Sequence, residues 1–250
     1  IGVHGRQSYL EFHPAQSLRE LVQYAQKHHP NISPATYISS SLDTYLDQQR
    51  EVVLGPDLSD RRNVMQSVVK SKAVQDAIRR ESIEHKVSML EAERRAIGYV
   101  NEIVSDYSAS AVRFADVALT RLWTQLYDGV EVHNFSTVRE LAKDYEIIYT
   151  PCHRSHIDYL LLSYVIYIRG MMIPYIAAGD NLNLPYVGQL LRGCGAFFIR
   201  RSFRGNNLYT SVFKEYLYSI LSRNTPLEYF IEGGRSRTGR LLPPKTGMLA

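Results

Sequence analysis

The chain has 250 residues, of which 45% are hydrophobic and 22% charged, and its formal net charge is +4 at pH 7. These proportions are typical of a globular protein and exclude a disordered chain, a collagen-like repeat and a disulfide scaffold. The two cysteines, Cys152 and Cys194, are well separated, which fits a reducing compartment. The chain starts at Ile1 without a visible signal peptide, so we expect it to be a piece of a longer protein.

The charge is distributed unevenly along the chain. Residues 1–150 contain 17 basic and 20 acidic side chains, whereas residues 151–250 contain 12 basic and 5 acidic ones. A basic half favours an anionic partner, which is a nucleic acid, an anionic lipid headgroup or a phosphorylated small molecule.

The first 129 residues divide into two parts. Residues 1–60 are polar and contain several prolines, which predicts an irregular N-terminal segment with short helices, one of them over residues 17–28. From residue 61 to 129, apolar residues recur at helical spacing, which predicts a helical subdomain of two or three long helices. We find no catalytic pattern in either part.

From residue 130 to 250, short apolar runs alternate with helical patterns. We expect strands at 146–151, 173–178, 196–199 and 227–231, and helices at 156–168, 186–191 and 208–222. This alternation predicts an α/β fold with a mostly parallel sheet flanked by helices. The longest apolar region, 159–179, is interrupted near its middle, which favours a buried helix and a strand over a membrane span.

Three charged loops follow the predicted strands, at residues 153–158, 200–204 and 232–240. Because sites in open parallel sheets form at the carboxyl ends of the strands, we expect these loops to meet. His153 and Asp158 would lie about 140° apart on one helix, but they can meet if His153 precedes the helix and Asp158 lies in its first turn. The carboxylate would then fix the imidazole tautomer and leave the other nitrogen as a base. Alternatively, Ser155 or Asp158 only caps the helix.

Other chemistries for the first loop have weaker support. His153, His156 and Asp158 could share a metal, but their spacing does not match a zinc motif. Cys152 would point away from His153 on extended backbone, and Ser155 lacks the Gly-x-Ser-x-Gly turn of a serine nucleophile.

The other two loops have the composition of an anion site. Arg200 and Arg201 directly follow an apolar strand, and a guanidinium group can bind phosphate with two parallel hydrogen bonds. In the third loop, Gly233 and Gly234 let backbone N–H groups converge on an anion, with Arg235 and Arg237 adding charge beside Glu232. The alternative is a solvated strand end and a glycine turn with exposed arginines.

Residues 239–246, GRLLPPKT, nearly match a nucleotide-binding P-loop. Pro244 replaces the glycine before Lys245, and proline has no N–H for a phosphate cradle. We therefore reject a nucleotide hydrolase.

Taken together, the three loops resemble the glycerol-phosphate acyltransferases of the phospholipid acyltransferase superfamily. The matching blocks are His153–Asp158, Gly195–Arg201 and Phe230–Ser236, in the family's order, and the strings HRSHIDYLLLSY, GAFFIRR and FIEGGRSRTGR look like the bacterial membrane-bound members. The resemblance covers about residues 50–250, and the chain stops before the family's fourth block.

The resemblance implies acyl transfer from acyl-CoA or acyl-carrier protein to the 1-hydroxyl of glycerol 3-phosphate. His153 would be the base and Asp158 its support, while Arg201, Arg235 and Arg237, together with Arg200, would bind the phosphate. Glu232, Gly233 and Ser236 would belong to the acceptor pocket. The resemblance implies no metal, no bound cofactor and no nucleic-acid partner.

The same resemblance implies a membrane surface as a partner and a place at the cytoplasmic face of the inner membrane. Two alternatives stay open. One is acylation of dihydroxyacetone phosphate, and the other is a non-catalytic module that binds phosphate headgroups.

Overall fold

The computed structural model describes residues 17–54, 61–203 and 205–245. Within these ranges, four strands form one sheet in the order β1-β4-β2-β3. The strands are β1 Ile148–Tyr149, β2 Tyr175–Gly179, β3 Ala196–Ile199 and β4 Leu227–Glu228. Every neighbouring pair is parallel, so the predicted α/β class with a parallel sheet is confirmed.

Helices connect the strands, as parallel pairing requires. They are α8 Asp158–Ile168, α9 Val187–Gly193 and α10 Asn207–Leu221, with a short 3-10 turn at Asp180–Leu182. Helix α7, Phe135–Leu141, precedes β1. The prediction from the sequence did not include α7. It also made β1 and β4 too long, because the apolar runs at 146–151 and 227–231 each contribute only two residues to the sheet. The strand at 196–199 was predicted with its observed bounds.

Residues 61–129 are helical, but the prediction of two or three long helices is wrong. The chain forms α3 Arg61–Lys70, α4 Lys72–Glu84, α5 Met89–Ile103 and α6 Ala109–Leu126. Serines interrupt the continuous apolar pattern: the Oγ of Ser71 accepts a hydrogen bond from the N–H of Val74, and Ser88 does the same for Glu91. Such caps begin a new helix without any proline or glycine.

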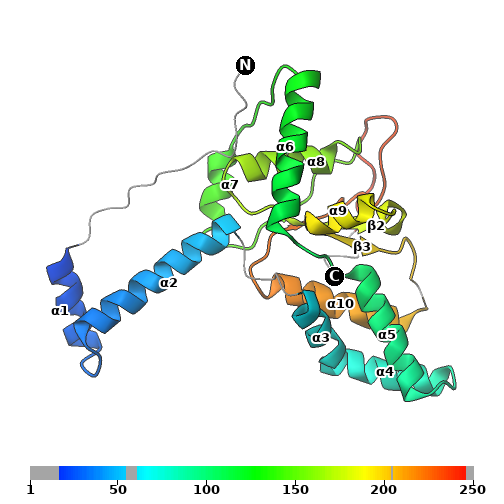
Figure 1. Ribbon diagram of the computed structural model, residues 1–250, viewed down its shortest axis with the longest axis horizontal. Coiled ribbons are helices and arrows are strands. Elements are labelled where there is room, and N and C mark those ends of the chain that lie inside the picture. The colour runs from blue at the N-terminus through cyan, green and yellow to red at the C-terminus, as the bar shows by residue number, and fades with distance from the viewer. Residues whose placement is uncertain (1–16, 55–60, 204, 246–250) are drawn as a thin grey trace.

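The N-terminal part also differs from the prediction of short helices. Helix α1 spans Leu18–His28, close to the predicted 17–28, but α2 spans Pro34–Leu54 and has 21 residues. Pro34 is the first residue of α2, a position where the missing N–H is tolerated. Figure 1 shows α1 and α2 extending away from the sheet. Residues 1–16 and 55–60 lie outside the described ranges.

The two faces of the sheet are covered by different helices (Figure 1). Side chains such as Tyr175, Phe197 and Leu227 pack with α3, α4, α5 and α10 in the largest apolar cluster. Side chains of the opposite face, such as Ala178 and Phe198, pack against Leu191 of α9. The helical part therefore builds the core under one face, while the other face is left to α6, α8 and α9 and to the site.

None of the helices in the described ranges combines the length and the apolar character needed to cross a membrane.

Candidate active site

The three charged loops leave the sheet at its carboxyl edge, after β1, β3 and β4, and they meet there. Residues from all three line one cavity of about 1160 Å³. The polar end of this cavity is lined by His153, Arg200, Arg201, Gly233, Gly234 and Arg235. The expected convergence of the loops is therefore present in the structure.

His153 and Asp158 lie in contact at the start of α8. Nδ1 of His153 is 3.3 Å from Oδ2 of Asp158. The same oxygen accepts hydrogen bonds from the N–H groups of Arg154 at 2.6 Å and Ser155 at 2.7 Å. Asp158 therefore organises the loop before α8 and also contacts His153. The alternative that Ser155 or Asp158 only caps the helix is wrong, because the N-cap residue is Ile157 and no side chain caps this helix. With Nδ1 facing the carboxylate, Nε2 is left for a substrate.

The segment that follows β4 contacts both the ring and the backbone of His153. The ring of Phe230 stacks on the imidazole with 3.9 Å between centroids and 26° between planes. The N–H of His153 donates to Oε1 of Glu232 at 3.0 Å, and its carbonyl accepts from the N–H of Ser236 at 2.8 Å. No role for Phe230 was predicted from the sequence, although its position two residues before Glu232 in the motif is a usable signal.

Glu232 is buried and joins two backbone segments. Its second oxygen, Oε2, accepts from the N–H of Leu242 at 3.0 Å. The hydrogen bonds from Leu242 and His153 lower the pKa of this carboxyl below its usual value. Glu232 and the buried Ser236 thus fix the loop that carries His153, and neither of them lines the cavity. Their predicted part in binding the acceptor stays a prediction.

The four arginines differ in their surroundings. Arg201 and Arg235 are exposed, line the cavity and form no ion pair with the described residues. Arg200 also lines the cavity, but its Nε and Nη2 each donate to the carboxylate of Glu102 on α5 at 2.6 Å. Arg237 is exposed and does not line the cavity. Arg201 and Arg235 are therefore the better placed of the four predicted phosphate ligands.

The rest of the cavity is apolar. Its walls come from α6, α8, α9 and the open face of the sheet, and include Val112, Phe114, Leu119, Leu160, Tyr164, Ile176, Val187, Leu190 and Leu191. A cavity with a long apolar wall and a few polar groups at one end suits a ligand that is mostly hydrocarbon.

Part of the chain matches a known protein family. Residues 129–250 match the family model named Acyltransferase. An acyltransferase domain is therefore present at residues 129–250. Curated proteins named glycerol-3-phosphate acyltransferase match nearly the whole chain, so the resemblance inferred from the sequence is confirmed.

Three of these relatives give the measure of the similarity. The protein of Pseudomonas fluorescens strain SBW25 and that of Ectopseudomonas mendocina strain ymp are each 48% identical over 246 residues, or 98% of this chain and 29% of theirs. The protein of Pseudomonas fluorescens strain Pf-5 is 47% identical over 250 residues, or 100% of this chain and 30% of its own. The chain thus spans about 30% of the length of these relatives.

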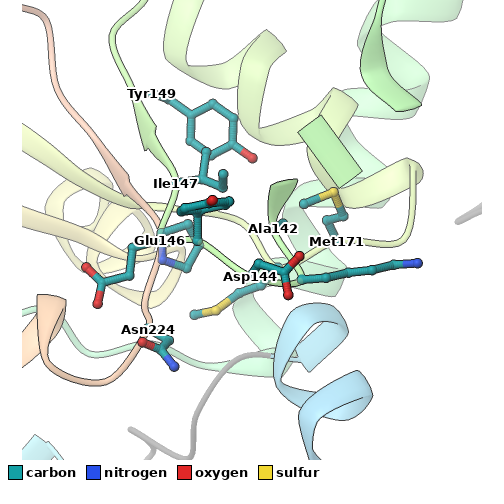
Figure 2. A pocket seen from close by; sticks show the side chains of 11 residues that line it. Ala142, Asp144, Glu146, Ile147, Tyr149, Met171 and Asn224 are labelled. Atoms are coloured by element: carbon teal, nitrogen blue, oxygen red, sulfur yellow. The ribbon is translucent and has the colours of Figure 1, made fainter. Parts of the chain in front are cut away.

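The acyltransferase domain has a second pocket, whose lining side chains, such as Tyr149 and Met171, are shown in Figure 2. It has a volume of about 490 Å³ and is lined by residues that precede β1, β2 and β4, among them Lys143, Asp144, Met171 and Asn224. None of the residues that line this pocket also lines the cavity of His153, so the two are separate.

Among the residues that the structure describes, no group of three or more His, Cys, Asp or Glu side chains is arranged to hold a metal ion.

Proposed function

We propose that this protein transfers a fatty acyl group from an acyl thioester to the 1-hydroxyl of glycerol 3-phosphate. The observation that carries the proposal is the His153–Asp158 pair, whose imidazole lines a largely apolar cavity together with Arg201 and Arg235. The names of the relatives agree with this activity. The products would be 1-acyl-glycerol 3-phosphate and a free thiol.

The proposed reaction uses one base and no covalent enzyme intermediate. Nε2 of His153 takes the proton of the 1-hydroxyl while its oxygen attacks the thioester carbonyl carbon. The tetrahedral intermediate then collapses, the carbon–sulfur bond breaks, and the thiolate takes the proton back from the imidazolium. Asp158 favours the charged ring through Nδ1, and a positioned base of this kind contributes about 10²–10⁴-fold.

The two ends of the cavity match the two ends of the reaction. The apolar walls of α6, α8 and α9 take the acyl chain, and Arg201 and Arg235 take the phosphate of the acceptor. Guanidinium groups suit this task because they donate two parallel hydrogen bonds to phosphate oxygens. The donor is acyl-CoA or acyl-carrier protein, and the chemistry as proposed needs no metal and no bound cofactor.

We further propose that the protein works at the cytoplasmic face of the inner membrane, with no nucleic-acid partner. Two features support a membrane surface: the excess of basic residues in 151–250, and the exposed apolar side chains Phe114, Val117 and Tyr186 on and beside the helices that line the cavity. Sedimentation with vesicles tests this. Binding to vesicles with anionic lipid is expected, and no binding to any vesicle would contradict it.

The activity is tested by thiol release from palmitoyl-CoA by the complete protein, with product identification. We expect release that depends on glycerol 3-phosphate and gives the 1-acyl product. Release that is faster with dihydroxyacetone phosphate would assign the alternative acceptor. Binding of glycerol 3-phosphate without any thiol release from either donor would indicate a non-catalytic binding module.

A further inference from the structure

The segment that resembles a P-loop returns to the active site. The N–H of Leu242 donates to Glu232, as described above, and the N–H of Lys245 donates to the carbonyl of Ile231 at 2.7 Å. Glu232 therefore holds the backbone of His153 with one oxygen and this segment with the other. The position of Lys245 is thus tied to the position of the base.

The side chain of Lys245 lies directly over Gly233. A Cβ atom at position 233 would come within 2.7 Å of Cδ and 3.3 Å of Nζ of Lys245. Gly233 also has a φ of +61°, which side chains other than glycine rarely adopt. The glycine therefore leaves room for the lysine to cross the loop and reach the cavity, which Lys245 lines together with His153.

The charges at this end of the cavity are unbalanced. Arg201, Arg235 and Lys245 line it, and none of them forms an ion pair with the residues that the structure describes. Arg200 is matched by Glu102, and the acidic residue among those that line the cavity is Asp116 on α6. A phosphate monoester carries nearly two negative charges at pH 7, so two or three cations suit it better than one.

We propose that Lys245 is a third phosphate ligand for the acceptor, beside Arg201 and Arg235, and that Gly233 is required because it lets Lys245 pass. This inference rests on the proposed function, since it takes glycerol 3-phosphate as the acceptor. The lysine ammonium would act as a point charge with rotatable donors, complementing the planar forks of the arginines.

The test compares Lys245→Met, Lys245→Arg and Lys214→Met in the complete protein. Lys214 is exposed on α10 and lines no part of the cavity, so it controls for the loss of a surface charge. We expect Lys245→Met to raise KM for glycerol 3-phosphate about tenfold or more and to leave KM for palmitoyl-CoA unchanged. Lys245→Arg should recover most of the loss, and Lys214→Met should match the unaltered protein.

A second pair of variants tests the role of the glycine. Gly233→Ala should raise KM for glycerol 3-phosphate, because its methyl group displaces Lys245. Gly239→Ala is the control, since Gly239 has a similar φ of +74° but no atom within 4 Å of an added Cβ. Equal effects of the two glycine variants on KM would contradict the steric argument.

The outcomes separate this inference from the proposed function. Absence of thiol release by the unaltered protein contradicts the function itself. An unchanged KM for glycerol 3-phosphate in Lys245→Met contradicts the lysine assignment alone, and a raised KM for palmitoyl-CoA only would assign Lys245 to a phosphate of the donor. For a variant without turnover, the rise in melting temperature caused by glycerol 3-phosphate replaces KM, and a rise equal to that of the unaltered protein overturns the assignment.

Discussion

Asp158 places three hydrogen-bond donors around one carboxylate oxygen at the residue scale. Two of them are backbone N–H groups that fix the start of α8, and the third is Nδ1 of His153. Asp158 therefore stabilises the local fold and also supports the proposed base. Substitution by asparagine and by alanine can separate these two roles.

We expect Asp158→Asn to lower kcat by roughly 10²-fold or more with a small change in melting temperature. An asparagine oxygen can still accept from the loop, but the amide neither stabilises the imidazolium nor fixes its tautomer in the same way. Asp158→Ala should lower both kcat and the melting temperature, because the N–H groups of Arg154 and Ser155 lose their acceptor. Steady-state kinetics and thermal unfolding distinguish the two variants, and an Asp158→Asn protein with unaltered kcat would refute the assigned support.

At the residue scale, the contacts that could be predicted from the sequence are those between residues close together in the chain. His153 and Asp158 are five residues apart, so helix geometry alone limited how they could meet. The bond from His153 to Glu232 spans 79 residues, and that from Arg200 to Glu102 spans 98. Neither the periodicity of the sequence nor the spacing of its motifs indicates contacts between residues this far apart. The supporting role of Glu232 and the partner of Arg200 are therefore visible only in the folded structure.

At the scale of elements, Arg200 attaches the helical part to the sheet. Its guanidinium is bound by Glu102 of α5 and lies over the rings of Tyr99 on α5 and Tyr209 on α10. These contacts draw α5 and α10 together at the end of β3, directly before Arg201. The ion pair with Glu102 also explains why Arg200 and the adjacent Arg201 have different surroundings.

We expect Glu102→Gln to lower the free energy of unfolding by about 1 kcal/mol, because the bidentate ion pair is lost at a partly exposed site. Glu93→Gln, on the same helix, should change it little, since Glu93 forms no ion pair within the described ranges. Denaturant unfolding measures both. Equal stability of the Glu102→Gln and unaltered proteins would contradict the role of this pair.

Strand β4 carries a second carboxyl with a different environment. Glu228 is fully buried beside Tyr149 in the register of β1, and neither of its oxygens has a hydrogen-bond partner among the described residues. Burial, with a smaller contribution from the charge of Asp158, raises the pKa of Glu228 to about 8 from 4.5. The folded state therefore keeps a proton that the unfolded chain releases above pH 4.5, so this carboxyl destabilises the fold increasingly as pH rises toward 8.

We expect Glu228→Gln to remove this dependence on pH. Near pH 5 the variant and the unaltered protein should have similar stability. Near pH 8 the variant should gain on the order of 4 kcal/mol relative to the unaltered protein, as the shift in pKa implies. Thermal unfolding at both pH values checks this, and a difference that does not change with pH would contradict the assigned protonation.

The bounds of helices and strands were predicted well where the apolar pattern of the segment itself marks them. They were predicted poorly where a helix cap sets the boundary. The apolar run at 196–199 is bounded by Gly195 and Arg200, and both of its ends were found. Within 61–129, the serine caps at positions 71 and 88 divide a pattern that reads as continuous. Because a serine inside a helical pattern is usually neutral, only its hydrogen bond shows that a new helix begins.

At the scale of the whole molecule, the site depends on parallel topology. The loops after β1, β3 and β4 leave one edge of the sheet, so residues from 153 to 245 reach a single cavity. The sequence predicted this edge from the order of strands and charged loops. It did not predict the cavity wall, because α6 precedes the sheet by many residues and only the folded chain places it beside α8 and α9.

The central claim is that His153 is the base of an acyl transfer, and its most direct test is the kcat/KM of His153→Ala in the complete protein. The assay is thiol release from palmitoyl-CoA in the presence of glycerol 3-phosphate. His133→Ala is the matched control, since His133 is exposed before α7 and lies outside the cavity. We expect a loss of about 10²–10⁴-fold for His153→Ala and no loss for the control. Full activity of His153→Ala would contradict the account.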